Sequence, residues 1–490
     1  MRSFLIAVSR NPLSMLGAAI ATACALVMLS LLALELVGLH VTPYVGILIF
    51  LILPAILLAA LLLIPLGLRQ ERRREAAAEG DEAAGKEGLF PVVDFNRESV
   101  RRAAFVIFVL SVVNLVLFSA ATYKGVEVME SDAFCGEACH SVMEPEYRAY
   151  QASTHANVGC VQCHIGPGTE SFLKAKLNGA WQVASVNFDL YERPIPVPVH
   201  DLRPAHETCG ECHRPGAWTG DKLKVIPIYG EDEANTRTST VLGLHVGGTR
   251  AGQSEGIHWH ADPNIEVRYR SDPKRERIGT IEVRYADGSV KTFLPPEGFE
   301  EQGATDEGMT EVWRTMDCTD CHNRVGHPFL TAERAVDEAL AAGLLDASLP
   351  FLRREAVAAL TAGDVGGASE DGESGEGPPK GEILETITTH ILSFYSQQHP
   401  DVLASNRQGV ERAAATVADL YDRNVYPRMN LGWGAYPNHI GHERFPGCFR
   451  CHDDEHATED GETLAQDCFA CHSMIAIEEE EPEILALLEE

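Results

Sequence analysis

Positive charge is scarce in this sequence of 490 residues. Lys and Arg together number 40 against 71 Asp and Glu, so the formal net charge is -31 at pH 7. Nucleic-acid binding requires a basic face for the phosphates, and this balance therefore argues against nucleic acid as a partner. The acidic excess is densest in residues 364–385 and 478–490. The length has room for roughly three domains.

Charged residues are almost absent from three stretches, 13–38, 44–68 and 103–123. Each stretch is close to the roughly 20 residues that an α-helix needs to cross a bilayer. The first exceeds the apolar core of a signal peptide, about 7–15 residues, so we expect a retained span and not a cleaved leader. The alternative is a single anchor followed by two buried core helices.

The distribution of Lys and Arg predicts the orientation of these spans. The connector around Val41 has neither residue, whereas the loop 69–102 carries eight of them. Positive loops stay in the cytoplasm, so we expect everything after Tyr123 to lie outside, in a multi-pass protein of a bacterial inner membrane. Glu35 lies near the outer end of the first span, where a carboxylate is costly without a partner or water. It is either a functional residue or a solvated interfacial one.

Cysteines are absent from the loop 69–102 and concentrated after Tyr123. Of the 13 cysteines, Cys24 lies in the first apolar stretch and is expected to be an inert thiol. The other twelve form six close pairs, each followed directly by a histidine; the first pair has one additional intervening residue. The six sites are Cys135/Cys139/His140, Cys160/Cys163/His164, Cys209/Cys212/His213, Cys318/Cys321/His322, Cys448/Cys451/His452 and Cys468/Cys471/His472.

The C-x-x-C-H pattern is typical of c-type haem attachment. Two thiols three positions apart project from one helical turn and can bond both vinyl groups, and the next imidazole then reaches the iron. Zinc sites give no reason for a histidine after every pair, and six redox disulfides in one chain would be unusual. We therefore predict six covalently attached haem c groups in a domain that faces the periplasm.

Each haem iron needs a sixth ligand, and thirteen of the 19 histidines lie outside the motifs. In the run GIHWH, His258 and His260 would point to the same face of a strand, and we expect at least one of them to ligate a haem. Ligation by two histidines favours electron transfer over substrate binding because it closes the open position. The further candidates are His155, His206, His327, His442 and His456 near motifs, and His245, His390, His399 and His439 farther away.

The pattern predicts a mainly α fold with sparse secondary structure, in which three transmembrane helices precede an exported multihaem domain with a small β insertion. Apolar residues alternate with polar ones on both sides of Asp287 and Gly288, which predicts a hairpin. Helices are expected over 333–345, 383–398 and 407–423. The predicted segments are a transmembrane hairpin (1–68), a cytoplasmic loop (69–102), a third span (103–123), haem sites 1–3 (124–213), the β insertion (214–311), haem site 4 (312–345), a helical segment (346–428) with an acidic linker (364–382), haem sites 5–6 (429–474) and an acidic tail (475–490), which is either a solvated charge run or a docking peptide.

Three stretches, FCGEACHSVMEPEY, STHANVGCVQCHIGPG and KAKLNG, resemble the NapC/NirT family of membrane-anchored quinol dehydrogenases. The resemblance covers residues 104–213 and 316–327. It implies a cytochrome that oxidises quinol and passes electrons to a periplasmic partner. The sequence GWGAYPNHIGHERFPGCFRCHDDEH and the last motif resemble longer members, so we expect a six-haem version of the family.

The resemblance also implies roles for single residues. Met143 matches a methionine that ligates the first haem, and it competes with His140 for that iron. His155 matches the far ligand of the fourth haem, and His327 that of the second. Lys176, with Lys174 close by, matches a ligand or neighbour of the third haem. His442 and His456 are implied as far ligands of the last two haems.

The function that we expect first is quinol oxidation at the outer leaflet and electron relay through six haems. Met143, Lys174 and Lys176 would lie near the quinol, and Glu35 would accept a proton. One alternative is a terminal reductase of a small oxyanion, although all six motifs end in histidine, which argues against it. The other is an electron-wiring subunit of a larger respiratory complex.

Overall fold

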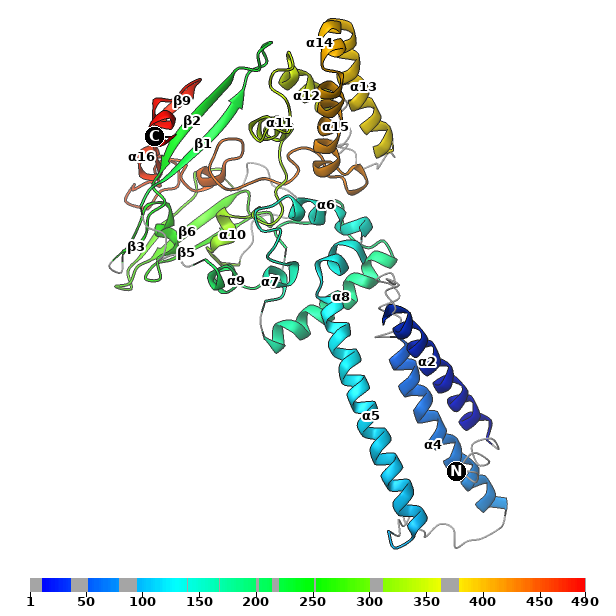
Figure 1. Cartoon of the computed structure of the whole chain (residues 1–490). Helices are drawn as coiled ribbons and strands as arrows, with labels where there is room; N and C mark the ends of the chain where they lie inside the picture. The colour runs from blue at the N-terminus through cyan, green and yellow to red at the C-terminus, as the bar shows by residue number, and fades with distance from the viewer. Residues whose placement is uncertain are drawn as a thin grey trace. The chain divides into compact units, whose positions relative to one another are not determined.

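The computed structural model divides the chain into two units, Met1–His140 and Ser141–Glu490, which we describe separately (Figure 1). The structure describes residues 11–36, 52–78, 95–138, 140–166, 168–199, 202–213, 220–250, 253–299, 312–362 and 379–489.

The first unit contains three long apolar helices, α2 (Pro12–Leu36), α4 (Leu53–Ala78) and α5 (Glu98–Met129). Each has a stretch long and apolar enough to cross a membrane, which confirms the three expected spans. Two boundaries differ from the expectation, because α4 continues through residues 69–78 and α5 starts before residue 103. Both ends of the expected cytoplasmic loop are therefore helical.

Small side chains hold α2 against α4. Ser14 donates its hydroxyl to the carbonyl of Ile64 at 2.9 Å, and Ala60 is only 2 % exposed. A Cβ on Gly17 would lie 2.7 Å from the carbonyl oxygen of Ala60, so only glycine permits this approach. Close backbone contact through small residues is the usual way in which helices associate in a bilayer, and it accounts for the expected hairpin.

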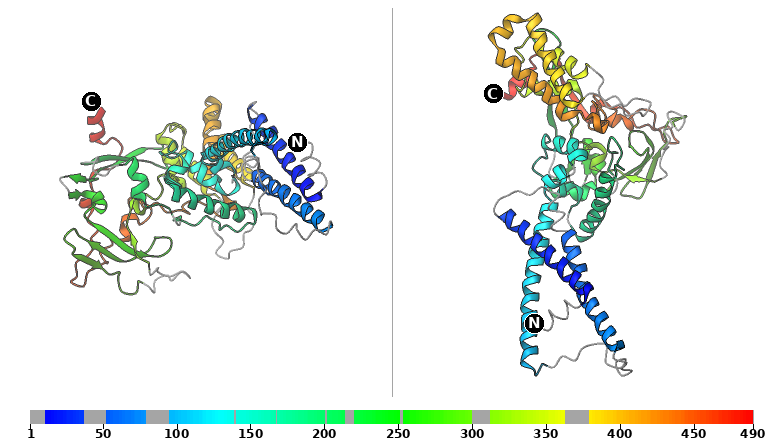
Figure 2. Two further views of the ribbon diagram at one scale, coloured as in Figure 1. Left: turned by 90° about the horizontal axis from the view of Figure 1, so that it is seen from below. Right: turned by 90° about the vertical axis from the view of Figure 1, so that its right-hand side faces the viewer.

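A helical bundle forms part of the second unit (Figure 2). Its apolar core includes Leu352, Ile391 and Val410, each with no exposed surface. The helices over 383–398 and 407–423 are confirmed, the first beginning at Lys380, inside the expected linker. Residues 364–378 of that linker lie outside the described residues. The members of the bundle are α11 (Ala332–Ala341), α12 (Leu352–Thr361), α13 (Lys380–Gln398), α14 (Pro400–Ser405) and α15 (Arg407–Asn424).

The expected β insertion forms two sheets and a short ribbon, but it is not self-contained. One sheet has the order β7-β6-β5-β8 and the other the order β1-β2-β9. The hairpin at Asp287–Gly288 is confirmed, with Gly288 at φ 83°. The strands are β1 (Lys222–Tyr229), β2 (Arg237–Leu244), β3 (Gly248–Arg250), β4 (Gln253–Glu255), β5 (Glu266–Ser271), β6 (Ile278–Arg284), β7 (Val290–Phe293), β8 (Arg314–Thr315) and β9 (His472–Glu479).

Strand β9 makes the start of the C-terminal segment part of a sheet. It starts at the histidine of the sixth motif and pairs antiparallel with β2, from Leu244↔His472 to Ser239↔Glu479. The segment 475–490 is therefore not simply a solvated charge run: it begins in a sheet and continues into the helix α17 (Glu483–Glu489).

Short helical turns carry the motifs and their surroundings. Because a single turn brings its first and fourth residues together, it suits paired thiols. These turns and the neighbouring helices are η3 (Phe134–Ala138), α6 (His140–Gln151), α7 (Cys160–His164), α8 (Thr169–Asn187), α9 (Ala205–Thr208), η4 (Cys209–Glu211), η6 (Gly256–Ala261), α10 (Cys318–Cys321), η7 (Pro427–Met429), η8 (Gly447–Arg450) and α16 (Cys468–Cys471).

Candidate functional site

Each of the last five motifs contains one short turn that leads to its histidine. In α10, Asp317 accepts the backbone N–H of Thr319, and the Asp320 carboxylate accepts the backbone N–H of Asp317 at 2.7 Å. This capping box fixes the start of the turn. At its end, the His322 N–H donates to the carbonyl of Cys318 at 2.8 Å. In the fourth motif, neither Cys318 nor Cys321 forms a disulfide, as haem attachment requires.

The third and fifth motifs depart from the expected geometry at their second cysteines, and in the fifth η8 ends at Arg450, before Cys451. Cys209 lies in η4, but this 3₁₀ turn ends at Glu211, so Cys212 lies outside the helix that was expected to present both thiols. The Cys212 N–H still donates to the carbonyl of Cys209 at 3.2 Å, which keeps the two residues one turn apart. The Cys212 side chain is exposed, whereas that of Cys209 is partly buried. Attachment of haem through Cys212 therefore stays a prediction, and its thiol lies on the solvent side of the site.

The histidines of these five motifs each face a second histidine from another part of the chain. Two imidazoles that bind one metal ion from opposite sides, each through a nitrogen about 2 Å from the metal, have centroids roughly 6 Å apart. The observed spacings fit this requirement. The pairs are His164–His327 at 6.0 Å, His213–His155 at 6.0 Å, His322–His258 at 6.4 Å, His452–His260 at 6.0 Å and His472–His442 at 6.1 Å.

Backbone carbonyls orient several of these rings. Nδ1 of His327 lies 2.8 Å from the carbonyl oxygen of Glu146, and Nδ1 of His260 lies 3.0 Å from that of Ile257. Nδ1 of His452 lies 3.1 Å from the carbonyl of Ala465. A hydrogen bond at Nδ1 fixes the ring and leaves Nε2 for a metal, which is the usual arrangement of ligating histidines.

Burial favours the neutral, iron-binding form of three of the paired rings. It lowers the pKa of His164 and of His260, and it lowers the pKa of His327 to about 4. A cationic imidazole has no lone pair for a metal, so desolvation favours the ligating state.

The expected strand through GIHWH is wrong, because residues Gly256–Ala261 form the 3₁₀-helix η6. With about three residues per turn, positions two apart point in different directions. His258 therefore faces the fourth motif at His322, and His260 faces the fifth at His452.

Two positions taken from the family resemblance also differ. His155 faces His213 of the third motif and not the histidine of the fourth. Lys176, implied beside the third site, lies on α8 with its Nζ 4.9 Å from the centroid of the Phe172 ring. The third motif thus has a histidine where the resemblance implied a lysine.

His456 does not have the geometry of a far ligand. Its Nδ1 lies 2.7 Å from Oδ2 of Asp453, and its Nε2 lies 3.1 Å from the carbonyl of Gly279. It is 1 % exposed. Both ring nitrogens of His456 thus have protein partners, and the ring that faces the fifth motif's His452 is His260.

Other candidate histidines have partners of a different kind. His245 lies between Asp221, at 3.0 Å from Nδ1, and the Ser473 hydroxyl, at 3.1 Å from Nε2. His390 pairs with Glu355 at 3.1 Å. These contacts assign both histidines to packing around the bundle and the sheet.

The first site has a local distortion that explains its additional residue. Cys135 lies in η3, which is a π-helical turn. A π-turn holds one residue more than an α-turn, so it absorbs the insertion that the sequence suggested would form a small loop. Met143 lies on α6 and is half-buried, next to the buried Val142. Cys139 and the side chains of His140 and Glu35 lie outside the described residues.

Sequence reasoning missed a polar cluster that supports the fourth and fifth motifs. The buried Asp320 accepts hydrogen bonds from the Tyr269 hydroxyl at 2.5 Å and from Nε of Arg314 at 3.0 Å. Arg450, beside the fifth motif, donates to the Asp320 carbonyl at 2.6 Å. No spacing pattern in the sequence predicts such a cluster, because its residues come from four separate elements, β5, β8, α10 and η8.

Arg324 also lies close to the fourth motif. Its guanidinium stacks on Tyr436 at 4.5 Å, and Nε donates to the carbonyl of Pro437 at 3.2 Å. Burial lowers the pKa of Arg324 to about 10. Buried guanidinium groups of this kind are suited to hold carboxylates such as haem propionates.

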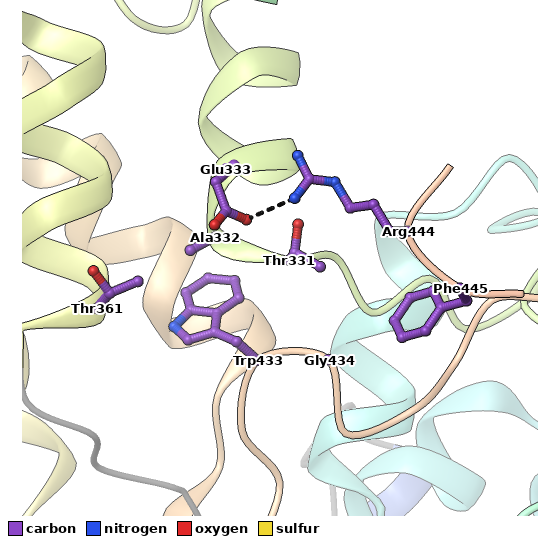
Figure 3. A pocket seen from close by; sticks show the side chains of 8 residues that line it. All are labelled: Thr331, Ala332, Glu333, Thr361, Trp433, Gly434, Arg444 and Phe445. Carbon is purple, nitrogen blue, oxygen red and sulfur yellow. Dashed lines mark hydrogen bonds and ion pairs between the residues drawn. The ribbon is translucent and has the colours of Figure 1, made fainter. Parts of the chain in front are cut away.

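A separate hollow of about 490 Å³ lies beside α11 (Figure 3). Glu333 and Arg444 form an ion pair of 3.2 Å across its rim, and Trp433 lies on its floor. The described residues that line it belong to no motif and to no histidine pair, so it is distinct from the candidate haem sites.

Residues 97–193 match the NapC/NirT cytochrome c family, N-terminal region. The chain belongs to this family and is a membrane-anchored multihaem c-type cytochrome of electron transfer. It is 37 % identical over 473 residues to the cytochrome c-type protein ImcH of Geobacter sulfurreducens, across 95 % of this chain and 88 % of that protein. No solved structure matches the chain.

Proposed function

We propose that the protein oxidises quinol at the outer leaflet of the membrane and relays the electrons through six covalently attached haem c groups to an acceptor outside. The observation that carries this proposal is the set of five histidine pairs, each with a motif histidine on one side. Haem iron supplies the one-electron chemistry. A quinol loses two electrons and two protons, and the protons leave on the outer side.

The five pairs support a far ligand for each of the second to sixth haems. His327, His155 and His258 are the far ligands of the second, third and fourth haems. His260 and His442 serve the fifth and sixth. Arg324 and the Asp320 cluster hold the backbone around the fourth and fifth sites. At the first site, His140 and Met143 remain the two ligand candidates.

Paired ligation favours a relay over a terminal reductase. A reductase needs one iron with an open position in a pocket that supplies protons. In five sites a second histidine occupies that position, so the small-oxyanion reductase is the weaker alternative. A role as the electron-wiring subunit of a larger complex is compatible with the same geometry and would extend the proposed function.

The outer face of α8 supports a quinol site at the membrane surface. Leu173, Leu177 and Trp181 follow one another at four-residue intervals and are 57 %, 74 % and 65 % exposed. This spacing aligns them on one helix face, and a Trp on such a face is typical of membrane interfaces. The quinol would bind beside this face, with Lys174, Lys176 and Met143 near its head group. Glu35, in the first unit, stays the proposed proton acceptor on the sequence argument alone.

The orientation follows from charge. Eight Lys and Arg residues lie in 69–102, and the three spans then put the haem domain in the periplasm of a bacterial inner membrane.

The test is reduction by quinol of the purified protein in detergent. Pyridine haemochrome should give about six haems per chain, and a reduced menaquinol analogue should reduce them rapidly. Lys176→Met should slow this reduction, whereas the matched control Lys222→Met, on β1, should not. Haems that stay oxidised with menaquinol but accept electrons from a soluble donor would rule out the proposal.

A further inference from the structure

The sixth motif lies at the exposed edge of a sheet (Figure 1). The turn α16 runs directly into β9, which is hydrogen-bonded to β2 on one side and is the last strand of its sheet. The His245 N–H donates to the carbonyl of Cys471 at 2.8 Å, which ties the motif to the end of β2. This support holds the sixth motif rigidly at the surface of the unit.

The edge carries apolar side chains that face solvent. Phe469, within the motif itself, is 76 % exposed, and Ile477 and Met474 on β9 are 60 % and 44 % exposed. Grouped apolar side chains on a surface typically mark contact with another molecule. We call Phe469, Met474, Ile477 and the acidic run Glu478–Glu481 the exit surface.

Negative charge surrounds this apolar group. Residues 453–490 contain fourteen Asp and Glu and no Lys or Arg. Among the described residues, Glu462 pairs with Lys291, and Oδ2 of Asp453 lies 2.7 Å from Nδ1 of His456. The basic residues of this sheet are Arg237, at the start of the neighbouring strand β2, and Lys222 and Lys224 on β1, at the opposite edge.

We infer that the exit surface docks a soluble one-electron carrier whose own redox centre is ringed by lysines. This inference rests on the proposed relay function and names the partner of its sixth haem. One electron passes from the sixth haem to the carrier's redox centre, whose oxidation state falls by one. No proton is transferred, and no bond is made or broken. An apolar centre with a charged rim gives fast, oriented and short-lived encounters with a partner of opposite charge.

The charge also selects against other occupants. The anionic surface of a membrane would repel the acidic run, and so would a second copy of the same surface. A cationic protein is the partner that the exit surface attracts.

The experiment measures oxidation of the full-length protein in detergent after chemical reduction and removal of excess reductant. Mitochondrial cytochrome c, a soluble carrier with a lysine-rich haem edge, is the probe in stopped flow. The bimolecular rate should fall as ionic strength rises. The triple variant E478Q/E480Q/E481Q should lower the rate at low salt about tenfold. Ferricyanide, an anion, should oxidise the same variant at least as fast as the native protein.

The matched control is E385Q/D401N/E411Q, which removes three exposed acids from the bundle helices α13, α14 and α15. It should leave the cytochrome c rate unchanged. Equal rates for both triple variants, or no dependence on salt, would overturn the inference. Because the protein is reduced chemically, this result is independent of quinol oxidation, which is measured separately on the same sample.

A second variant covers the apolar part of the exit surface. Ile477→Ser should slow oxidation by cytochrome c several-fold and leave the particle mass unchanged. If it lowered the mass of the detergent-solubilised particle without changing the rate, the edge would be an interface between copies of this chain, and the inference would be wrong.

Discussion

The ring of His327 lies 6.0 Å from that of His164, although His327 follows the fourth motif and His164 belongs to the second. The contact joins two distant parts of the chain at one proposed haem. The same holds for His442 and His472 in the C-terminal segment. The haem sites therefore depend on the tertiary fold. A substitution in one histidine pair tests both this fold and the proposed ligation.

Replacing His327 by Met should raise the reduction potential of one haem by on the order of 0.1 V, because a Met/His pair raises the potential relative to two histidines. Spectropotentiometry and electron paramagnetic resonance would detect one changed haem. His206→Met, at an exposed position on α9, is the control and should change no haem. An unaltered spectrum for His327→Met would contradict the proposed pairing.

His456→Ala should destabilise the protein by roughly 1–3 kcal/mol, because it leaves buried partners without their hydrogen bonds. It should not alter the spin state of any haem, since both ring nitrogens already have protein partners. Denaturant unfolding and the visible spectrum would be measured on one preparation. The appearance of a high-spin haem would restore His456 as a ligand.

Asp320→Asn should cost roughly 3–5 kcal/mol of unfolding free energy, because it removes the anion of a buried cluster that contains Arg275 and Arg314. Denaturant unfolding measures this loss. Asp401→Asn, at an exposed site, provides the comparison for the same chemical change. Equal stability of the two variants would contradict a structural role for the cluster.

The stability of the protein should fall when the pH drops from about 6.5 to about 4. Burial first, and then the positive charges of Arg450, Arg324 and Arg275, lower the pKa of His439 to about 4. In that window the unfolded chain binds a proton that the folded chain does not, so acid favours unfolding. The contribution of this group is about 3 kcal/mol.

The measurement is the difference in unfolding free energy between pH 7 and pH 4, in native protein and in His439→Asn, which cannot titrate. The variant should lose less stability than the native protein over this range. If both lost the same amount, His439 would not be responsible.

Leu177→Asp should slow reduction by menaquinol about tenfold if the apolar face of α8 lies at the membrane surface, because a charge there opposes insertion. Complete reduction by dithionite should be unchanged. Leu344→Asp introduces the same charge at a residue that is 60 % exposed in the second unit, and it should have no effect. Equal quinol rates would remove α8 from the proposed site.

Local features of the fold could be predicted from the sequence, whereas contacts between distant segments could not. The three spans follow from apolar length. The turns that carry cysteine pairs follow from their spacing, with Cys212 and Cys451 each one residue beyond its turn. The hairpin at Asp287–Gly288 follows from alternation and turn chemistry. Each of these depends on a few consecutive residues.

The partner of each motif histidine depends instead on tertiary packing. Nearness in sequence favoured His456 at the fifth motif, but Asp453 and the carbonyl of Gly279 hold that ring in the protein interior. The alternating run GIHWH is equally compatible with a strand and with a tight helical turn. Gly256, at φ 66°, allows the chain to turn into η6, and a periodicity argument gives no weight to this angle.

The helix η6 has only six residues, and it holds one proposed ligand for the fourth haem and one for the fifth. Neither iron can lose its far ligand through a movement of this turn without affecting the other. A substitution that displaces the backbone there would remove the far ligand from both haems at once. A redox titration would then show two haems changing together. The distance between these two proposed haems is likewise set by the backbone of η6, so a change at one haem alone cannot alter it.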